Sequence, residues 1–435
     1  MKLPMRLPIY LGISVLPLTT LHAAPENIVP QTGAIRNCVR AKTGGEEMIY
    51  ISEEDGTVSL TTLAGKTLWR NIPDCPALMF ETIAHDIDGD SSDDLIAASS
   101  NGSVYAWKSD GKLLWKFTTP EISRLSEIAV VGRGEQSRIF AGGNNFKIYE
   151  LDAKGKLLSA IPIKGTVRIL ETGRFVDSQK EDLFVLTYSH DKFRSEYMAF
   201  IDSDTKKEHS RSSVSKFLKN STMITDNAVA DIDSDGKDDI ILFGASETAE
   251  VAAFSSDFRK LLKFSGNKDK QRYAHTKGAV LSPLKDEIVL QYGGVRYLID
   301  FNGKLISRYG ERNKGIIFNK LVPMPDSKLL LGAGQVGGDN TFYVFNLAKS
   351  GWMSTRHEYG GLYAEISDNL DKLYRQALSF TMPDYQKKKL KPFITLGLDG
   401  NKAGCKDTWL KGFDLDKELE KLDGGNLLMV SVGVT

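Results

Sequence analysis

The sequence predicts an all-β β-propeller of seven four-stranded blades, followed by a small α/β region at the C-terminus. Three observations lead to this prediction: one segment contains four short apolar stretches separated by turns, the segment recurs along the chain, and the composition changes after Ser350. Four-stranded units repeated at this period cannot bury their own faces, so each must pack against its neighbours.

The clearest repeat covers residues 81–117 and reads "ETIAHDIDGDSSDDLIAASSNGSVYAWKSDGKLLWKF". Its apolar stretches are short enough to be strands, and Asn101-Gly102 and Asp110-Gly111 lie between them. Such pairs occupy tight hairpins, where glycine adopts a positive φ without strain. The unit is therefore expected to be an antiparallel meander of about 37 residues.

The same plan recurs at spacings of roughly 40 to 57 residues, a period typical of propeller blades. The other units cover residues 39–69, 128–158, a longer stretch from 167 with an insertion after His190, 228–264, 278–309 and 320–347. Seven is the best count. Six or eight remain open, because the fourth unit is stretched and the last is weak.

The chain divides into residues 1–24, 25–349 and 350–435. Lys2 and Arg6 precede an apolar run at residues 7–21 and then small residues near Ala23, a pattern typical of a cleaved secretory signal peptide. The protein is thus expected to be exported, to the periplasm, the cell surface or the medium. No other stretch approaches the roughly 20 apolar residues of a membrane-spanning helix.

The propeller is expected to occupy residues 25–349. After it, residues 364–380 have helical periodicity, and residues 393–398 and 426–434 look like buried strands. This α/β region is either an incomplete domain or a small appendage.

The charge balance argues against a nucleic-acid partner. Lys plus Arg and Asp plus Glu both number 56, giving a net charge of zero, whereas phosphate binding needs a basic surface. The three cysteines, Cys38, Cys75 and Cys405, form no zinc-binding pattern. A Cys38–Cys75 disulfide and buried free thiols are both open, and Cys405 is unpaired in either case.

Two aspartate-rich loops share one spacing. The first, "DIDGDSSDD", begins at Asp86, and the second, "DIDSDGKDD", begins at Asp231. Aspartates stand at positions 1, 3, 5 and 9 of both. Alternate carboxylates in a tight loop can turn inward around a calcium ion, which accepts six to eight oxygen ligands in irregular geometry. The alternative is an acidic turn exposed to water.

An EF-hand is excluded, because position 12 holds Ala97 or Leu242 instead of glutamate and strands flank both loops. Elsewhere the pattern is lost: the fourth unit keeps only Asp177 and Asp182.

The units that contain "DIDGDSSDDLIAAS" and "DIDSDGKDDIILFGA" resemble FG-GAP (VCBS-type) repeats, known from integrin α-subunit propellers and secreted bacterial proteins. The resemblance is strong over these two units and loose over the other five. It implies two structural calcium sites, with the ligands Asp86, Asp88, Asp90 and Asp94 in one and Asp231, Asp233, Asp235 and Asp239 in the other.

The endings "AGKTLW" and "SDGKLLW" also resemble the repeats of PQQ-like quinoprotein propellers. This second resemblance implies that Trp69 and Trp115 pack between blades. A quinone cofactor does not follow from it, since the match to the tryptophan-docking motif is partial.

No catalytic motif occurs in the sequence. His85 abuts the first aspartate loop and is not expected to be catalytic, because the second copy has Ala230 there. His275 and His357 are interpreted as surface residues, although either could line a pocket. Paired carboxylates of a glycoside hydrolase would form only in space. The sequence therefore predicts a monomeric, non-catalytic, calcium-binding scaffold that binds carbohydrate or another exported protein through its loops and channel mouth. Two alternatives remain: a polysaccharide lyase or hydrolase, and an envelope assembly scaffold of the quinoprotein-like type.

Overall fold

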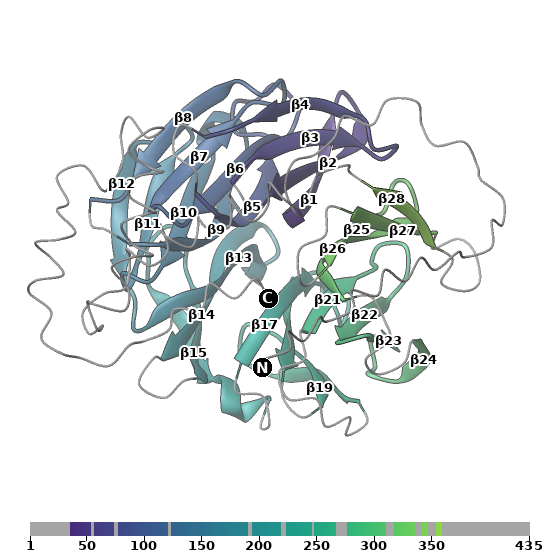
Figure 1. Ribbon diagram of the computed structural model, residues 1–435. Helices are drawn as coiled ribbons and strands as arrows, with labels where there is room; N and C mark the ends of the chain where they lie inside the picture. Colours follow the sequence, from purple (N-terminus) through teal and green to yellow (C-terminus); the bar gives the residue numbers. More distant parts are fainter. Residues whose placement is uncertain are drawn as a thin grey trace, which may run out of the picture.

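The computed structural model describes residues 35–53, 56–73, 77–120, 123–189, 194–218, 223–245, 248–266, 276–309, 317–335, 341–346 and 354–358. These residues form seven four-stranded antiparallel sheets, each made of four consecutive strands. The sheets are arranged as blades around a central channel (Figure 1). We number the blades 1 to 7 in chain order.

Blade 1 consists of β1 (Ile35–Thr43), β2 (Glu46–Glu53), β3 (Val58–Thr62) and β4 (Thr67–Asn71), and blade 2 of β5 (Met79–His85), β6 (Asp94–Ser99), β7 (Ser103–Trp107) and β8 (Leu113–Thr118). Blade 3 consists of β9 (Leu125–Val131), β10 (Arg138–Gly143), β11 (Lys147–Asp152) and β12 (Leu157–Pro162). Blade 4 consists of β13 (Thr166–Asp177), β14 (Lys180–Ser189), β15 (Arg194–Ile201) and β16 (Glu208–Ser213).

Blade 5 consists of β17 (Met223–Ala230), β18 (Asp239–Ala245), β19 (Ala249–Phe254) and β20 (Lys260–Ser265). Blade 6 consists of β21 (Thr276–Val280), β22 (Glu287–Tyr292), β23 (Val295–Asp300) and β24 (Leu305–Tyr309). Blade 7 consists of β25 (Phe318–Met324), β26 (Leu329–Gln335), β27 (Thr341–Asn346) and β28 (Ser354–Glu358). Two 3₁₀ turns, Gly134–Gln136 and Val214–Lys216, are the helical elements among the described residues. Neither is long and apolar enough to cross a lipid bilayer.

The blades are held together by apolar packing between their faces. A separate cluster of buried side chains fills each junction between neighbouring blades. The cluster of Ile49 and Ile51 with Met324 and Leu331 joins blade 1 to blade 7, so that the ring closes through side-chain packing and not through a shared sheet. Burial of apolar area between repeats is the main stabilising term in such an architecture.

The hairpin turns have the glycine conformations that the sequence predicts. Gly102, between β6 and β7, has φ 77°, and Gly111, between β7 and β8, has φ 89°. Gly111 also lies against the neighbouring blade: the indole Nε1 of Trp69 donates to the carbonyl of Ser109 over 2.7 Å, and a Cβ at position 111 would lie 2.8 Å from Trp69 Cδ2. Blade 1 therefore docks its tryptophan onto the β7–β8 turn of blade 2.

The same contact recurs one blade further on. Trp115 Nε1 donates to the carbonyl of Ala153 over 2.8 Å, and a Cβ on Gly155 would lie 2.5 Å from Trp115 Cδ2. The prediction that Trp69 and Trp115 pack between blades is confirmed.

We expect Gly155→Ala to destabilise the fold more than Gly65→Ala. Both glycines occupy the turn before the fourth strand with positive φ, 77° and 88°, but a Cβ at Gly65 would meet nothing within 4 Å. Gly65→Ala therefore measures backbone strain alone, whereas Gly155→Ala also overpacks the indole, adding about 1–3 kcal/mol. Urea unfolding of both variants checks this; equal losses would show that the tryptophan contact is not tight.

The C-terminal part of the fold prediction requires correction. The segment from residue 350 was expected to belong to an α/β region, yet Ser354–Glu358 forms β28, the last strand of blade 7. A fourth strand needs only backbone pairing with its neighbour, so "STRHE" has no apolar alternation that the sequence could reveal. The predicted helix at 364–380, the strands at 393–398 and 426–434, and the signal peptide lie outside the described residues.

Candidate functional site

Both predicted aspartate loops join the first and second strands of a blade. In blade 2, Asp86 accepts backbone N–H bonds from Gly89 at 2.7 Å and Ser91 at 3.0 Å, and it thereby closes the loop on itself. Gly89 and Ser91 have positive φ, 81° and 69°, which turns the chain tightly enough to bring alternate side chains together. Carboxylate oxygens of Asp86, Asp88 and Asp90 lie within 4.8 Å of one another.

The loop of blade 5 repeats this construction. Asp231 accepts N–H bonds from Asp235 at 3.1 Å and Gly236 at 2.9 Å. Here the oxygens that lie within 4.8 Å of one another belong to Asp231, Asp233 and Asp239.

The aspartate at position 9 is buried in both loops. Asp94 accepts the Ile87 N–H at 3.1 Å, and Asp239 accepts the Ile232 N–H at 2.9 Å. Burial, with the other loop carboxylates adding to it, raises the pKa of each carboxyl to about 7. The Oδ1 atom of Asp94 has no hydrogen-bond partner, so the loop leaves a hard, buried oxygen donor unsatisfied.

Basic side chains already contact these loops. The Lys108 ammonium bonds Asp88 and lies 2.9 Å from Asp90, and the Arg259 guanidinium lies 2.7 Å from Asp233. The bond to Lys108 lowers the pKa of Asp90. A metal ion bound among these carboxylates would therefore compete with an internal cation.

The aspartate at position 8 of each loop has a role that the sequence reading missed. Asp93 accepts the backbone N–H of Lys42 in blade 1 at 2.7 Å, and its own N–H donates to the Lys42 carbonyl at 2.9 Å. Asp238 makes the same pair with Arg174 in blade 4, at 2.8 and 3.1 Å. The Asp-Asp doublet that ends both motifs was the available signal: one member turns inward and the other binds the preceding blade.

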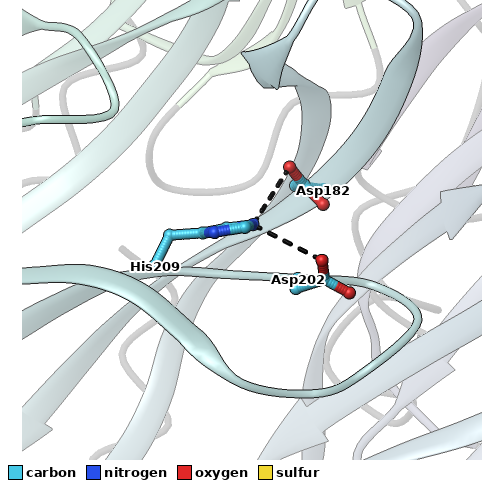
Figure 2. Close-up of side chains that lie close together, drawn as sticks. All are labelled: Asp182, Asp202 and His209. Carbon is cyan, nitrogen blue, oxygen red and sulfur yellow. Dashed lines mark ion pairs between the residues drawn. The ribbon is translucent and has the colours of Figure 1, made fainter.

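A third acidic cluster, in blade 4, was not predicted. The imidazole of His209, on β16, points between Asp182 of β14 and Asp202 (Figure 2), with Nε2 3.4 and 3.7 Å from their carboxylate oxygens. Lys180 Nζ lies 2.8 Å from Asp202 and 3.8 Å from Asp182. Burial raises the pKa of Asp182, and the bond to Lys180 lowers that of Asp202.

Asp182 corresponds by register to the buried aspartates of the two loops. It pairs with Gly173, just as Asp94 pairs with His85 and Asp239 with Ala230. Only a short turn separates β13 from β14, and Lys180 at its end supplies the positive charge. Blade 4 thus keeps the buried carboxylate of Asp182, and the ammonium of Lys180 lies close enough to compensate its charge.

The remaining predicted residues have simpler outcomes. His85 Nε2 contacts the Gly132 carbonyl at 2.8 Å and so links blade 2 to blade 3. Cys38 is a buried free thiol. Cys75, Cys405 and His275 lie outside the described residues, as does the side chain of His357.

The central channel contains a cavity of about 310 Å³. That volume lies at the lower end of the range for small-ligand sites. Side chains from the first strand of every blade line the cavity. The sequence reading placed ligands at the channel mouth but named no residue there.

The cavity lining is strongly charged. Four carboxylates face it, Glu81, Glu127, Glu171 and Asp226, together with the cations Arg36, Arg168, Lys277 and Lys320. Lys320 Nζ lies 3.7 Å from Glu81 and 3.9 Å from Asp226, and its pKa is raised, chiefly by Glu81. This ammonium compensates the charge of two carboxylates at once.

Two of the four carboxylates are in a different environment. Burial raises the pKa of Glu171 to about 7, and it raises that of Glu127 well above the usual range. Glu171 accepts a 2.6 Å hydrogen bond from Asn227 Nδ2 on the neighbouring blade. The cavity therefore combines carboxyl groups that retain a proton near neutral pH with carboxylates paired to a lysine, an arrangement suited to general acid–base chemistry.

Comparison with known proteins supports the propeller fold and finds relatives that are similar in sequence. A family model described as the λ-carrageenase β-propeller domain matches residues 48–168. The λ-carrageenase of Pseudoalteromonas carrageenovora is 25% identical over 405 residues, covering 84% of this chain and 41% of that protein. A λ-carrageenase from another Pseudoalteromonas is 24% identical over 403 residues, with the same coverage. The chain spans less than half the length of the curated relatives it matches.

Solved structures agree on the architecture. The WD40 domain of Neurospora crassa Pan2 has a TM-score of 0.52 at 13% identity, covering 72% of this chain and 88% of that chain. The WD40 repeats of RRP9 have a TM-score of 0.52 at 12% identity, covering 71% and 89%. These likenesses establish a β-propeller, and they do not identify the repeats as FG-GAP, VCBS or PQQ-like.

Proposed function

We propose that this chain is an exported, carbohydrate-active β-propeller that hydrolyses glycosidic bonds in a carrageenan-type polysaccharide. The similarity to λ-carrageenases over 84% of the chain favours this over the non-catalytic scaffold that the sequence alone suggested. The observation that carries the proposal is the cavity in which Glu171 lies with the carboxylates paired to Lys320.

Hydrolysis of a glycosidic bond needs two carboxyl groups in opposite protonation states. Glu171 is the general acid: burial keeps it protonated near pH 7, and it delivers that proton to the glycosidic oxygen as the carbon–oxygen bond breaks. A carboxylate paired with Lys320, Glu81 or Asp226, takes the proton from the attacking water. The Asn227 amide holds the Glu171 carboxyl in place.

The direct test incubates the protein with λ-carrageenan and, separately, with agarose, and follows the release of reducing ends. The proposal expects new reducing ends from λ-carrageenan and few from agarose. If the protein binds λ-carrageenan and leaves its chain length unchanged, the scaffold alternative is correct instead.

The dependence of kcat on pH should reflect the titration of Glu171. Because this carboxyl must be protonated to act as an acid and its pKa is about 7, kcat is expected to fall as the pH rises above about 7, approaching tenfold per pH unit. Initial rates between pH 5 and 9 check this. A rate that keeps rising to pH 9 would exclude Glu171 as the acid.

Calcium is part of the same proposal, as a structural ion in the two aspartate loops. The donor set is all oxygen, and the unsatisfied Oδ1 of Asp94 gives an ion a buried ligand to complete. Asp86, Asp88, Asp90 and Asp94 would hold one ion, and Asp231, Asp233, Asp235 and Asp239 the other. Bound calcium would neutralise the loop charge and stabilise the fold by mass action.

A further inference from the structure

The first strands of the blades run in the same direction along the channel. Near the starts of these strands, Asn319 Nδ2 donates to the Ile35 carbonyl, Ser126 Oγ to the Val167 carbonyl and Thr225 Oγ1 to the Thr276 carbonyl. Each contact joins the beginning of one first strand to the beginning of a neighbouring one. Residues that start these strands therefore share one end of the channel, which we call the entry end.

Arginines gather at the entry end. Arg36 is the second residue of β1, Arg124 directly precedes β9, and Arg168 is the third residue of β13. Arg36 and Arg168 line the cavity itself. The guanidinium carbons of Arg124 and Arg36 lie 4.7 and 5.7 Å from the centre of the Phe80 ring, so two cations from different blades contact one aromatic ring.

Two of these three charges form no salt bridge among the described residues. Among the described residues, neither Arg124 nor Arg168 forms an ion pair, and the buried Nε of Arg124 has no hydrogen-bond partner. Arg124 Nη2 bonds only the neutral amide of Asn144, at 3.2 Å. Burial, then the charges of Arg168 and Arg36, lowers the pKa of Arg124 to about 10, and the neighbouring Glu127 opposes this shift only in part. Gathering cations in this way is unfavourable unless an anion joins them.

We propose that Arg36, Arg124 and Arg168 form an oxyanion site that binds a sulfate ester of the polysaccharide. Guanidinium groups donate planar pairs of N–H bonds that match the oxygens of a tetrahedral oxyanion. The Phe80 ring positions Arg36 and Arg124, and the Tyr188 ring lies 5.9 Å from the Arg168 guanidinium carbon. The identity of the anion as a sugar sulfate rests on the proposed function, since carrageenans are sulfated galactans. The existence of an oxyanion site rests on the arginines alone.

The site would also set the register of the substrate. The carboxylates lie further along the same strands: Glu81 follows Phe80, Glu127 is the third residue of β9, and Glu171 is three residues beyond Arg168. A sulfate held at the entry end therefore places the adjoining sugar ring toward the carboxylates. Binding energy from a non-reacting substituent would in this way orient the scissile bond.

The test measures binding of a λ-carrageenan oligosaccharide, of its chemically desulfated form and of inorganic sulfate by calorimetry. Arg168→Gln and Arg36→Gln are the variants, two being used because either could perturb folding. Lys260→Gln is the charge-matched control, since Lys260 is an exposed residue on the outermost strand of blade 5. Circular dichroism checks that every variant is folded.

We expect the arginine variants to bind the sulfated oligosaccharide about 10- to 100-fold more weakly, with affinity for the desulfated form unchanged and Lys260→Gln like the wild type. If the wild type cleaves λ-carrageenan and the arginine variants bind it as tightly as Lys260→Gln does, the oxyanion site is wrong and the hydrolase stands. If no polysaccharide is cleaved but inorganic sulfate binds and is lost in Arg168→Gln, the site stands and the proposed function fails.

Discussion

Replacing Glu171 by glutamine is expected to lower kcat for λ-carrageenan hydrolysis by about 10²–10⁴-fold, with KM changed by less than about threefold. The amide keeps the shape of the side chain and can still accept the bond from Asn227, so folding and substrate binding should survive. What it loses is the proton that the leaving oxygen requires. Steady-state kinetics on the wild type and the variant separate the two effects.

Two further measurements assign that role specifically. A substrate with a good leaving group, such as an aryl glycoside, needs little protonation, so Glu171→Gln should be less impaired on it than on the polysaccharide. Glu135→Gln, an exposed carboxyl at the 3₁₀ turn of blade 3, is the charge-matched control and should behave like the wild type. Full activity in Glu171→Gln would show that Glu171 is not the general acid and that the cavity is not the catalytic site.

Removing calcium is expected to destabilise the propeller. At a free calcium concentration of about 100 times its Kd, each occupied loop would add about 3 kcal/mol to the free energy of unfolding. The melting temperature with a chelator should therefore lie several degrees below that with calcium. Asp88→Asn should shrink this difference, while Asp110→Asn, in an exposed hairpin of the same blade, should not.

Lys108 makes this prediction sharper. The Lys108 ammonium contacts Asp88 and Asp90, so the Lys108→Gln variant should be less stable than the wild type when a chelator removes calcium. The variant should also bind calcium more tightly, because the ion no longer has to displace an internal cation. Calorimetric titration with calcium measures this directly. An unchanged melting temperature with chelator, together with no calcium heat in any variant, would show that the loops are closed by Lys108 and Arg259 alone.

The sequence predicted the features that depend on local spacing. The aspartate loops, the glycine turns and the docking of Trp69 and Trp115 all follow from residues close together in the chain, since each blade is one continuous segment. The blade faces were also readable from their apolar strands. Polar outer strands such as β28 were not, because they need only backbone pairing.

The cavity could not be predicted in the same way, since it draws between one and four residues from each of seven strands spread over the chain. A partial signal was nevertheless present: Glu81, Glu127 and Asp226 are each the one carboxylate of a first strand that is otherwise apolar or neutral, whereas the strand of Glu171 carries further charges. A carboxylate that recurs in the first strand of successive repeats marks a position that faces the axis. The pairing of Lys320 with Glu81 and Asp226, and the raised pKa of Glu171, could not be predicted from the sequence, because both depend on contacts between blades of the closed ring.

Hydrolysis of a sulfated galactan in the propeller cavity is tested most directly by the chain length of λ-carrageenan after incubation with wild-type protein and with Glu171→Gln, measured by size-exclusion chromatography. We expect progressive shortening by the wild type and little over the same time by the variant, although both bind the polymer. Polymer of unchanged length with the wild type, or equal shortening by both proteins, would contradict hydrolysis in this cavity with Glu171 as the acid.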